Sequence, residues 1–267
     1  MNTGDYIYLY CVTKEQPNLQ GLGDLAGGLY LISAAGLYAS VCNVPKNEFC
    51  EENLENNFND LEWLKKNVDR HEKTIEGIMK GTSVIPFKLA TVFFNEQNLQ
   101  TFLEKYAGEI EEKLDYVKNK EEWGVKIYCE PGKLKQSLLL ESEKLREINS
   151  QISSASPGKA YLLNKKKTEL ISLETEVAII RYRKIFLELL ENNCFKARLL
   201  ELKPRKSTGR NDDMILNAAF LVDNNMVPRF ISQAKALESE PEFAAKGFYF
   251  NSTGPWPPYN FCHLTER

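Results

Sequence analysis

Residues 122–129 read EWGVKIYC, and they begin the half of the chain whose element order is most recognisable. Their β-branched and aromatic residues predict a strand, which Pro131-Gly132 ends. Leucines and isoleucines at steps of three and four, interrupted once by Glu141, then predict a helix from Leu134 to Ile152. The segment Ser153–Gly158 interrupts this pattern, which resumes from Ala160 to Leu187. Two such helices joined by a short loop are expected to pack as an antiparallel hairpin.

The second of these helices carries an apolar stripe with heptad-like spacing. It consists of Leu163, Leu170, Leu173, Val177, Ile180 and Leu187. We expect this stripe to be the seam of the hairpin, with an oligomerisation surface as the other interpretation. Near the start of the helix lies the basic run Lys165-Lys166-Lys167, which indicates either a solvated helix start or a contact with an acidic surface.

Towards the C-terminus, the pattern returns to short strands. Strands are predicted at Lys196–Leu202, Met214–Val222 and Gly247–Ser252, and a helix at Met226–Leu237. The resulting order, β-α-α-β-β-α-β, is that of a ferredoxin-like βαββαβ domain whose first helix is extended into a hairpin.

Towards the N-terminus, strands and helices alternate less regularly. We predict strand character at Tyr6–Val12, Leu29–Ser33, Leu37–Val44 and Ser83–Phe94, and helices at Phe58–Lys80 and Leu99–Tyr116. The regular βαβ repeat of a doubly wound sheet is missing. We therefore expect an α+β protein of two domains, residues 1–120 and residues 121–267, the second ferredoxin-like with an extended antiparallel helical hairpin.

Composition narrows the class of protein. The chain has 267 residues, 43% of them hydrophobic and 27% charged, as in ordinary globular proteins. No apolar run is long enough to span a membrane, and no signal peptide is visible. Its six cysteines form no CxxC pair and it has only two histidines, so we expect no metal site, no cofactor and reduced thiols in a cytosol. The modest basic excess of the second half does not indicate nucleic-acid binding.

The residue types that carry catalysis are present but not in a working pattern. The glycines from Gly21 to Gly28 do not form a phosphate-binding motif. His71 lies among charged residues and is expected on a solvated helix face, as is the carboxylate pair Glu121-Glu122. Cys262-His263 could pair a nucleophile with a base, but neighbours in an extended chain point to opposite sides. We therefore predict that the chain is not an enzyme.

Residues 252–261, STGPWPPYNF, form a stiff strip with two large rings close to the C-terminus. Three prolines exclude a helix or a central strand. Either Trp256 and Tyr259 fold back onto their own domain, or the strip presents an aromatic patch to a partner, since these residues dominate interface hot spots. A third interpretation is that the strip is a proline-rich ligand for an SH3- or WW-type domain of another protein, but the strip lacks the basic residues that usually flank such ligands. The candidate partner-binding residues are Gly254, Pro255, Trp256, Pro257, Pro258, Tyr259 and Phe261.

Several segments, in order along essentially the whole chain, resemble the gas vesicle proteins F and L. They are residues 6–8, 84–87 with 91–93, 122–126, 158–162, 217–222 and the strip 254–261. One departure stands out, because the family tends to have a basic-aromatic-glycine turn after the proline strand and this chain has Lys88-Leu89-Ala90.

The resemblance implies a minor protein of gas vesicles, with two α+β domains and no enzymatic activity. It also implies binding to the small, hydrophobic shell protein A, and to other accessory proteins, during vesicle nucleation and assembly. Two roles are open. The chain either stays with the shell, inside the cytoplasm, or acts as a cytosolic assembly factor that keeps shell subunits from aggregating and then leaves.

Overall fold

The computed structural model describes residues 5–22 and 28–264, and the chain divides into two compact units. Unit 1 combines the residues up to Glu122 with the C-terminal segment from Pro255, and unit 2 spans Trp123–Gly254. The expectation that the tail belongs to the second domain is therefore wrong. The tail lies in unit 1 because Tyr259 packs against the core of that unit.

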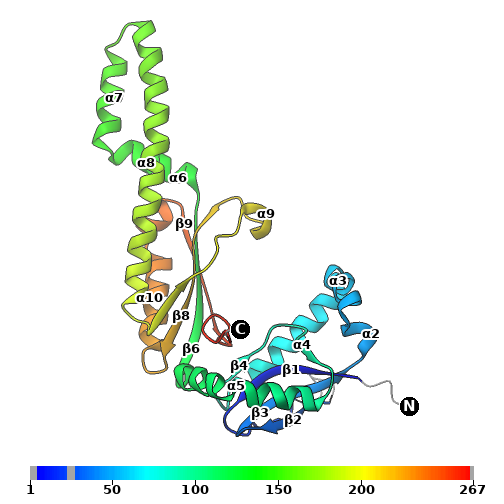
Figure 1. The fold of residues 1–267 in the computed structure, drawn as a ribbon. Coiled ribbons are helices and arrows are strands. Elements are labelled where there is room, and N and C mark those ends of the chain that lie inside the picture. Colours follow the sequence, from blue (N-terminus) through cyan, green and yellow to red (C-terminus); the bar gives the residue numbers. More distant parts are fainter. Residues whose placement is uncertain (1–4, 23–27, 265–267) are drawn as a thin grey trace. The chain divides into compact units, whose positions relative to one another are not determined.

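Unit 1 is built on an antiparallel sheet with the order β2-β3-β1-β4 (Figure 1). Its strands are β1 Tyr6–Thr13, β2 Tyr30–Ala34, β3 Leu37–Val44, β4 Ile85–Pro86 and β5 Val92–Phe93, the last of which also pairs with β1. The hairpin between β2 and β3 turns at Ala35 and Gly36, which both have positive φ as a type I′ turn requires.

The segment predicted as one strand at residues 83–94 is instead two short strands on either side of a turn. Pro86 ends the first because it has no N–H for the ladder. Thr91 N then bonds the carbonyl of Lys88, which closes the turn before Val92 returns to pair with β1.

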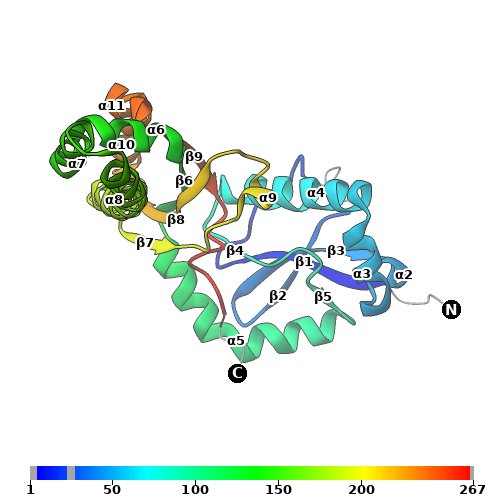
Figure 2. The ribbon, with the colours of Figure 1, turned by 90° about the horizontal axis from the view of Figure 1, so that it is seen from above.

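Unit 1 has four helices among the residues that the structure describes, and the two long ones begin at side-chain caps. The four helices are α2 Lys46–Phe49, α3 Glu51–Asn59, α4 Leu61–Met79 and α5 Glu96–Val117. The helix expected at residues 58–80 starts later because the Asp60 carboxylate accepts hydrogen bonds from the backbone of Glu62 and Trp63. Asn95 caps α5 in the same way. Figure 2 shows the sheet lying between α4 and α5.

The sheet of unit 2 has the order β7-β8-β6-β9. Its strands are β6 Lys120–Cys129, β7 Lys196–Leu199, β8 Asp213–Asp223 and β9 Phe248–Trp256. β9 runs past the predicted end at Ser252 and includes Pro255. The strand tolerates this proline because β9 lies at the edge of the sheet, where one side of the backbone needs no partner.

The helices of unit 2 build the hairpin and cover the sheet (Figure 1). They are α6 Pro131–Glu141, α7 Glu143–Ser153, α8 Pro157–Glu191, α9 Arg205–Thr208, α10 Val227–Ser239 and α11 Pro241–Ala245. The first arm of the hairpin is interrupted at Ser142, and the second is one helix of 35 residues. Phe186 and Leu190 of α8 pack with Phe220, Phe230 and Phe248 in the core of the unit.

The apolar stripe predicted on α8 is only partly the seam. Leu163, Leu170 and Leu187 pack against the core as expected. Leu173, Val177 and Ile180 are instead 57%, 55% and 68% exposed, so for these three residues the prediction was wrong. The buried residues at this level are Thr175, Ala178 and Tyr182, because α8 is apolar on two sides and the spacing alone does not tell which side meets the sheet.

Among the residues that the structure describes, no helix is long and apolar enough to cross a membrane. All six cysteines are free thiols, and four of them, Cys11, Cys42, Cys129 and Cys262, are buried.

Candidate functional site

The C-terminal tail is held against unit 1, and only its first residues face outward. Pro257 and Pro258 are buried, and Tyr259, Asn260 and Phe261 are half-buried. Pro255 is exposed, and Trp256 keeps 39% of its surface exposed. The two alternatives for the strip therefore apply to different residues: Tyr259 folds back, and Trp256 remains accessible.

A buried histidine receives the tail. His71 on α4 is 1% exposed, and its Nε2 lies 3.0 Å from the hydroxyl of Tyr259 and 3.0 Å from the carbonyl oxygen of Phe87. On the other side of the ring, Nδ1 lies 2.8 Å from the hydroxyl of Tyr8 on β1. The expectation of a solvated His71 is thus wrong, because His71 lies on the buried face of α4, between Asn67 and Ile75.

The hydrogen-bond partners define the protonation of this ring. The Phe87 carbonyl can only accept, so Nε2 must carry the proton. Nδ1 then accepts from the Tyr8 hydroxyl, which itself accepts from the backbone N–H of Ala90. Burial lowers the pKa of His71 to about 4, so the ring is neutral near pH 7.

The Tyr259 hydroxyl completes the network by donating to a carboxylate. Its acceptor is Glu72 Oε1 at 3.1 Å. Burial raises the pKa of Glu72, and the hydrogen bond from Tyr259 opposes that change by favouring the charged carboxylate. A single hydroxyl group therefore contacts two consecutive residues of α4.

A second attachment lies one residue further along the tail. The Glu122 carboxylate accepts from the backbone N–H of Asn260 at 3.0 Å and from its side-chain amide at 2.6 Å. Glu122 is only 4% exposed, which overturns the expectation that Glu121-Glu122 forms a solvated face. Two hydrogen bonds to one charged group fix both the position and the orientation of Asn260.

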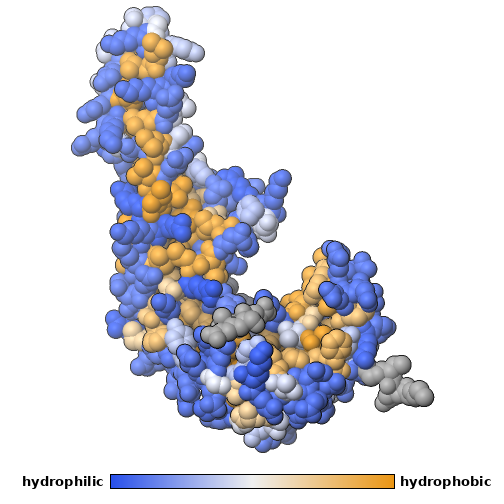
Figure 3. Space-filling model, viewed as in Figure 1, coloured by the Kyte–Doolittle hydropathy of each residue, from blue (hydrophilic) through white to orange (hydrophobic). Residues whose placement is uncertain are grey.

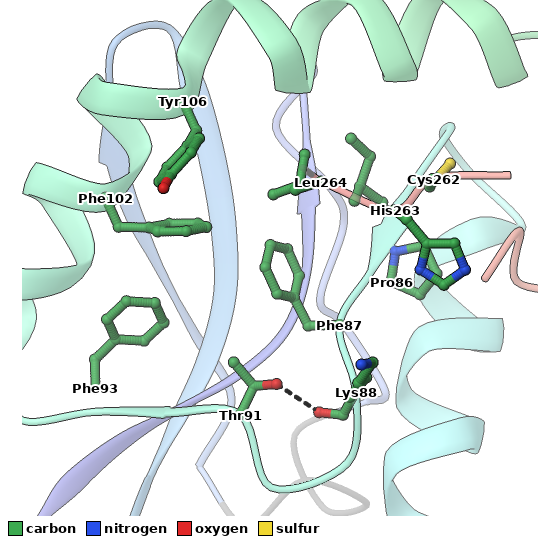
Figure 4. Close-up of a pocket in the computed structure, with 11 residues that line it drawn as sticks. Pro86, Phe87, Lys88, Thr91, Phe93, Phe102, Tyr106, Cys262, His263 and Leu264 are labelled. Atoms are coloured by element: carbon green, nitrogen blue, oxygen red, sulfur yellow. Dashed lines mark hydrogen bonds between the residues drawn. The ribbon is translucent and has the colours of Figure 1, made fainter. Parts of the chain in front are cut away.

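Residues 262–264 of the tail lie beside an apolar pocket of unit 1 (Figure 4). A cavity of about 430 Å³ lies between α5, the turn after β4 and these residues. Phe102 and Tyr106 of α5 form one wall with Phe87 and Phe93, whose rings lie 5.9 and 5.3 Å from Phe102. Leu264 supplies the tail's side of the wall, and Lys88 lies at the polar end.

Cys262 and His263 also line this pocket but do not form a catalytic pair. Cys262 is buried, and burial raises the pKa of its thiol to about 12, which makes the thiolate rare at neutral pH. His263 is exposed. No group of three or more His, Cys, Asp or Glu residues is arranged to hold a metal ion within residues 5–22 and 28–264.

The turn Lys88-Leu89-Ala90 connects the pocket to the histidine network. Ala90 has a φ of 63°, a left-handed conformation that favours glycine. Its backbone N–H nevertheless donates to Tyr8, at 3.2 Å. The contact made by this turn is therefore present although alanine stands at the strained position.

The sequence singled out the tail as a candidate site but did not predict the residues that hold it. His71, Glu72 and Glu122 are polar residues in polar stretches, and nothing local marks them as buried. One signal was available for His71. Its position between Asn67 and Ile75 places it four residues from each along α4, on the face that carries the buried residues.

Comparison with known proteins assigns the family. Residues 6–263 match the family model described as gas vesicle synthesis protein GvpL/GvpF. The chain belongs to this family. Gas vesicle protein L of Streptomyces sp. (strain CB03234) is 27% identical over 100% of this GvpL/GvpF chain and 96% of its own length. Gas vesicle protein F of Nostoc sp. (strain PCC 7120) is 23% identical over 75% of this chain and 79% of its own.

Solved structures of the family share the fold. The crystal structure of GvpF from Anabaena sp. PCC7120 superposes with a TM-score of 0.69 at 15% identity, over 98% of this chain and 100% of that one. GvpF from Microcystis aeruginosa gives a TM-score of 0.66 at 18% identity, over 97% and 99% of the two chains. The expected membership of the F and L family is confirmed, and with it a role connected with gas vesicles.

Proposed function

We propose that this GvpL/GvpF chain is a non-enzymatic minor component of the gas vesicle, which binds the main shell protein GvpA during nucleation and stays with the shell. Family membership supports the gas vesicle role. The observation that carries the binding proposal is the state of the tail. It is attached to unit 1 through Tyr259 and Asn260, while Trp256 is 39% exposed three residues before the first attachment.

An attached tail makes a better binding surface than a loose one. Side chains that are ordered before binding lose less conformational entropy when the partner arrives. The indole of Trp256 offers a large apolar face, and Pro255 keeps the backbone beside it stiff. Of the seven candidate residues, we therefore assign the partner contact to Pro255 and Trp256. We assign attachment to Pro257, Pro258 and Tyr259, and neither role to Gly254 or Phe261.

The aromatic pocket supplies a second contact for an apolar partner. Its volume of about 430 Å³ lies within the usual range for ligand sites. Half-buried aromatic rings at its wall would accept an aliphatic or aromatic side chain of a shell subunit. A protein whose surface must meet gas exposes such side chains before it assembles.

The strand order of unit 2 supports the interpretation of this unit as a ferredoxin-like domain. In β7-β8-β6-β9, the first and third strands of the unit are central and the second and fourth are at the edges. This is the arrangement of a ferredoxin-like sheet. We interpret unit 2 as a ferredoxin-like domain whose first helix is replaced by α6, α7 and α8.

Trp256→Ala tests the binding role. We expect it to weaken capture of shell protein by at least about tenfold and to lower vesicle yield, as truncation of an aromatic hot spot does. Phe94→Ala is the matched control, because Phe94 is an exposed aromatic residue of unit 1 outside the tail. Trp63→Ala, on α4, should also leave vesicle yield higher than Trp256→Ala does. Equal yields for all three variants would remove the special role of the tail.

Two further measurements complete this test. Thermal melts of each variant separate lost binding from lost folding. Stringent washing of purified vesicles, followed by immunodetection, distinguishes a retained component from a released one. If the chain is lost completely from washed vesicles and recovered in a soluble complex with shell protein, it is instead an assembly factor that leaves. If no shell protein is recovered with it, both roles are excluded.

A further inference from the structure

The middle of α8 carries an apolar strip that unit 2 does not cover. Leu173, Val177 and Ile180 follow one another at steps of four and three residues, so they lie on one face of the helix. All three are more than half exposed. Figure 3 shows apolar surface running as a band along the hairpin that contains α8.

This strip lies opposite the face with which α8 packs on its own unit. Successive residues of a helix advance by about 100°, so Val177 is about 200° around the helix from Thr175. Thr175, Ala178 and Tyr182 are buried on the packed side. A second apolar face on one helix is unexpected for a surface helix, which normally carries one.

We propose that this strip is an interface for a second copy of the same chain, paired antiparallel along α8 about a twofold axis. Such a pair places one surface against its own copy. The strip itself sets the register, because the midpoint between Leu173 and Ile180 lies between Glu176 and Val177. Leu173 of one chain then lies level with Ile180 of the other, at both ends of the strip.

The charges beside the strip complement each other in this register, although they play no part in choosing it. Lys184 comes level with Glu169 of the copy, and Lys166 lies within one residue of the level of Glu188 of the copy. All four side chains are exposed, and Lys184 also pairs with Glu188 of its own chain at 3.6 Å. The twofold axis repeats each contact, so four pairs of opposite charge flank the apolar strip, and one pair of like charge, Glu176 with its own copy, lies beside the axis.

A parallel pair of the same helices would have the opposite effect. It would place Lys166 beside Lys166 and Lys184 beside Lys184 of the copy, and like charges at facing positions oppose association. Charge complementarity therefore selects a second antiparallel α8.

Sedimentation of the full chain tests the proposal. The strip is small, so we expect a weak dimer that forms over a protein concentration of about 1 to 100 µM. The sedimenting mass should rise over this range from 30.6 kDa towards twice that value. Val177→Asp places two like charges near the twofold axis and should raise the dimer dissociation constant at least tenfold. Leu140→Asp is the matched control, since Leu140 is a more exposed residue of α6 and lies outside the strip.

Charge reversal tests the register. Lys184→Glu should weaken the dimer, and the double variant Lys184→Glu with Glu169→Lys should restore it. A dimer held together by nonspecific surface association would not regain its affinity in the double variant. Circular dichroism of each variant checks that the helices are intact.

A wild-type chain that stays monomeric at all concentrations overturns the proposal. So does a dimer that is unaffected by Val177→Asp. If Lys184→Glu weakens the dimer and the double variant does not restore it, the antiparallel register is wrong. A monomeric chain that loses shell-protein binding on Val177→Asp would show that the strip has a different occupant. Because these readouts need no vesicle, they stand apart from the test of the proposed function.

Discussion

At the residue scale, a neutral imidazole connects the tail to the sheet. His71 lies in the centre of a hydrogen-bond network in which each donor is defined. The N–H of Ala90 donates to the Tyr8 hydroxyl, which donates to Nδ1 of His71. On the other side of the ring, the proton on Nε2 is directed at the Phe87 carbonyl and the Tyr259 hydroxyl. A protonated ring would also carry a proton on Nδ1. The Tyr8 hydroxyl would then have to accept from both His71 and Ala90 and would have no acceptor for its own proton.

We therefore predict that His71 stays neutral, with its proton on Nε2, down to about pH 5. Burial lowers its pKa to about 4 from an ordinary value near 6.5. NMR of protein with ¹⁵N-labelled histidine measures the tautomer and the titration directly, because the chain has only two histidines. His71→Gln assigns the signal. A ring that is half-protonated at pH 6 would contradict the network.

The same shift makes stability depend on pH. The unfolded chain takes up a proton at His71 below about pH 6.5 and the folded chain does not, so the stability contributed by the neutral ring is lost as pH falls towards 4. By pH 5 this loss amounts to about 2 kcal/mol of unfolding free energy. Glu72, whose pKa burial raises, opposes it in part. His71→Gln should be less stable than the wild type at pH 7 and should show a smaller loss between pH 7 and pH 5.

At the element scale, the turn between β4 and β5 holds the network together under strain. Ala90 has a left-handed backbone conformation that costs an L-residue about 1–2 kcal/mol. Its N–H is needed by Tyr8, so the turn cannot relax without breaking that hydrogen bond. Alanine at this position therefore changes the energy of the turn and not its contact.

Ala90→Gly should consequently stabilise the protein. Relief of the left-handed strain exceeds the entropic cost of glycine, which leaves a net gain of about 0.5–1 kcal/mol in the free energy of unfolding. Ala107→Gly, in the interior of α5, is the control of opposite sign, with a loss of about 1 kcal/mol. Urea denaturation measures both. A destabilised Ala90→Gly variant would mean that this strain is absent.

At the scale of the whole molecule, the last residues of the chain complete its first unit. Unit 2 ends at Gly254 within β9, and the tail from Pro255 contributes Tyr259 to a core that is otherwise built from residues 6–92. The chain therefore folds unit 1 from two segments separated by the whole of unit 2. During synthesis, unit 1 therefore stays incomplete until the residues after unit 2 have been made.

Deletion of residues 255–267 should thus affect the unit that is distant in sequence. We expect faster hydrogen exchange in β1 and α4, which lose the contacts of Tyr259 with His71 and Glu72, and unchanged exchange in α8 and α10. Hydrogen exchange with mass spectrometry resolves these segments. Tyr161→Ala, which removes an exposed side chain of α8, is the control that should leave unit 1 unchanged. Faster exchange confined to unit 2 would contradict the assignment of the tail.

Much of the fold is predictable from the sequence, because local patterns carry it. The spacing of apolar residues locates α5, α10 and the hairpin, and β-branched runs locate β1, β3, β6 and β8. The Ala35-Gly36 turn and the caps at Asp60 and Asn95 depend on residues within four positions of each other. The family segments, which lie along the whole chain, also identified the gas vesicle proteins.

What the sequence by itself determined, then, is the set of elements, their order and the family. Only the tertiary structure decided which side of each element is buried. It showed that His71 and Glu122 receive the tail, that the tail belongs to unit 1, and that Leu173, Val177 and Ile180 face outward. The physical reason is distance along the chain. Tyr259 meets His71 across 188 positions, and no local propensity reports on a partner that only folding brings within 3.0 Å.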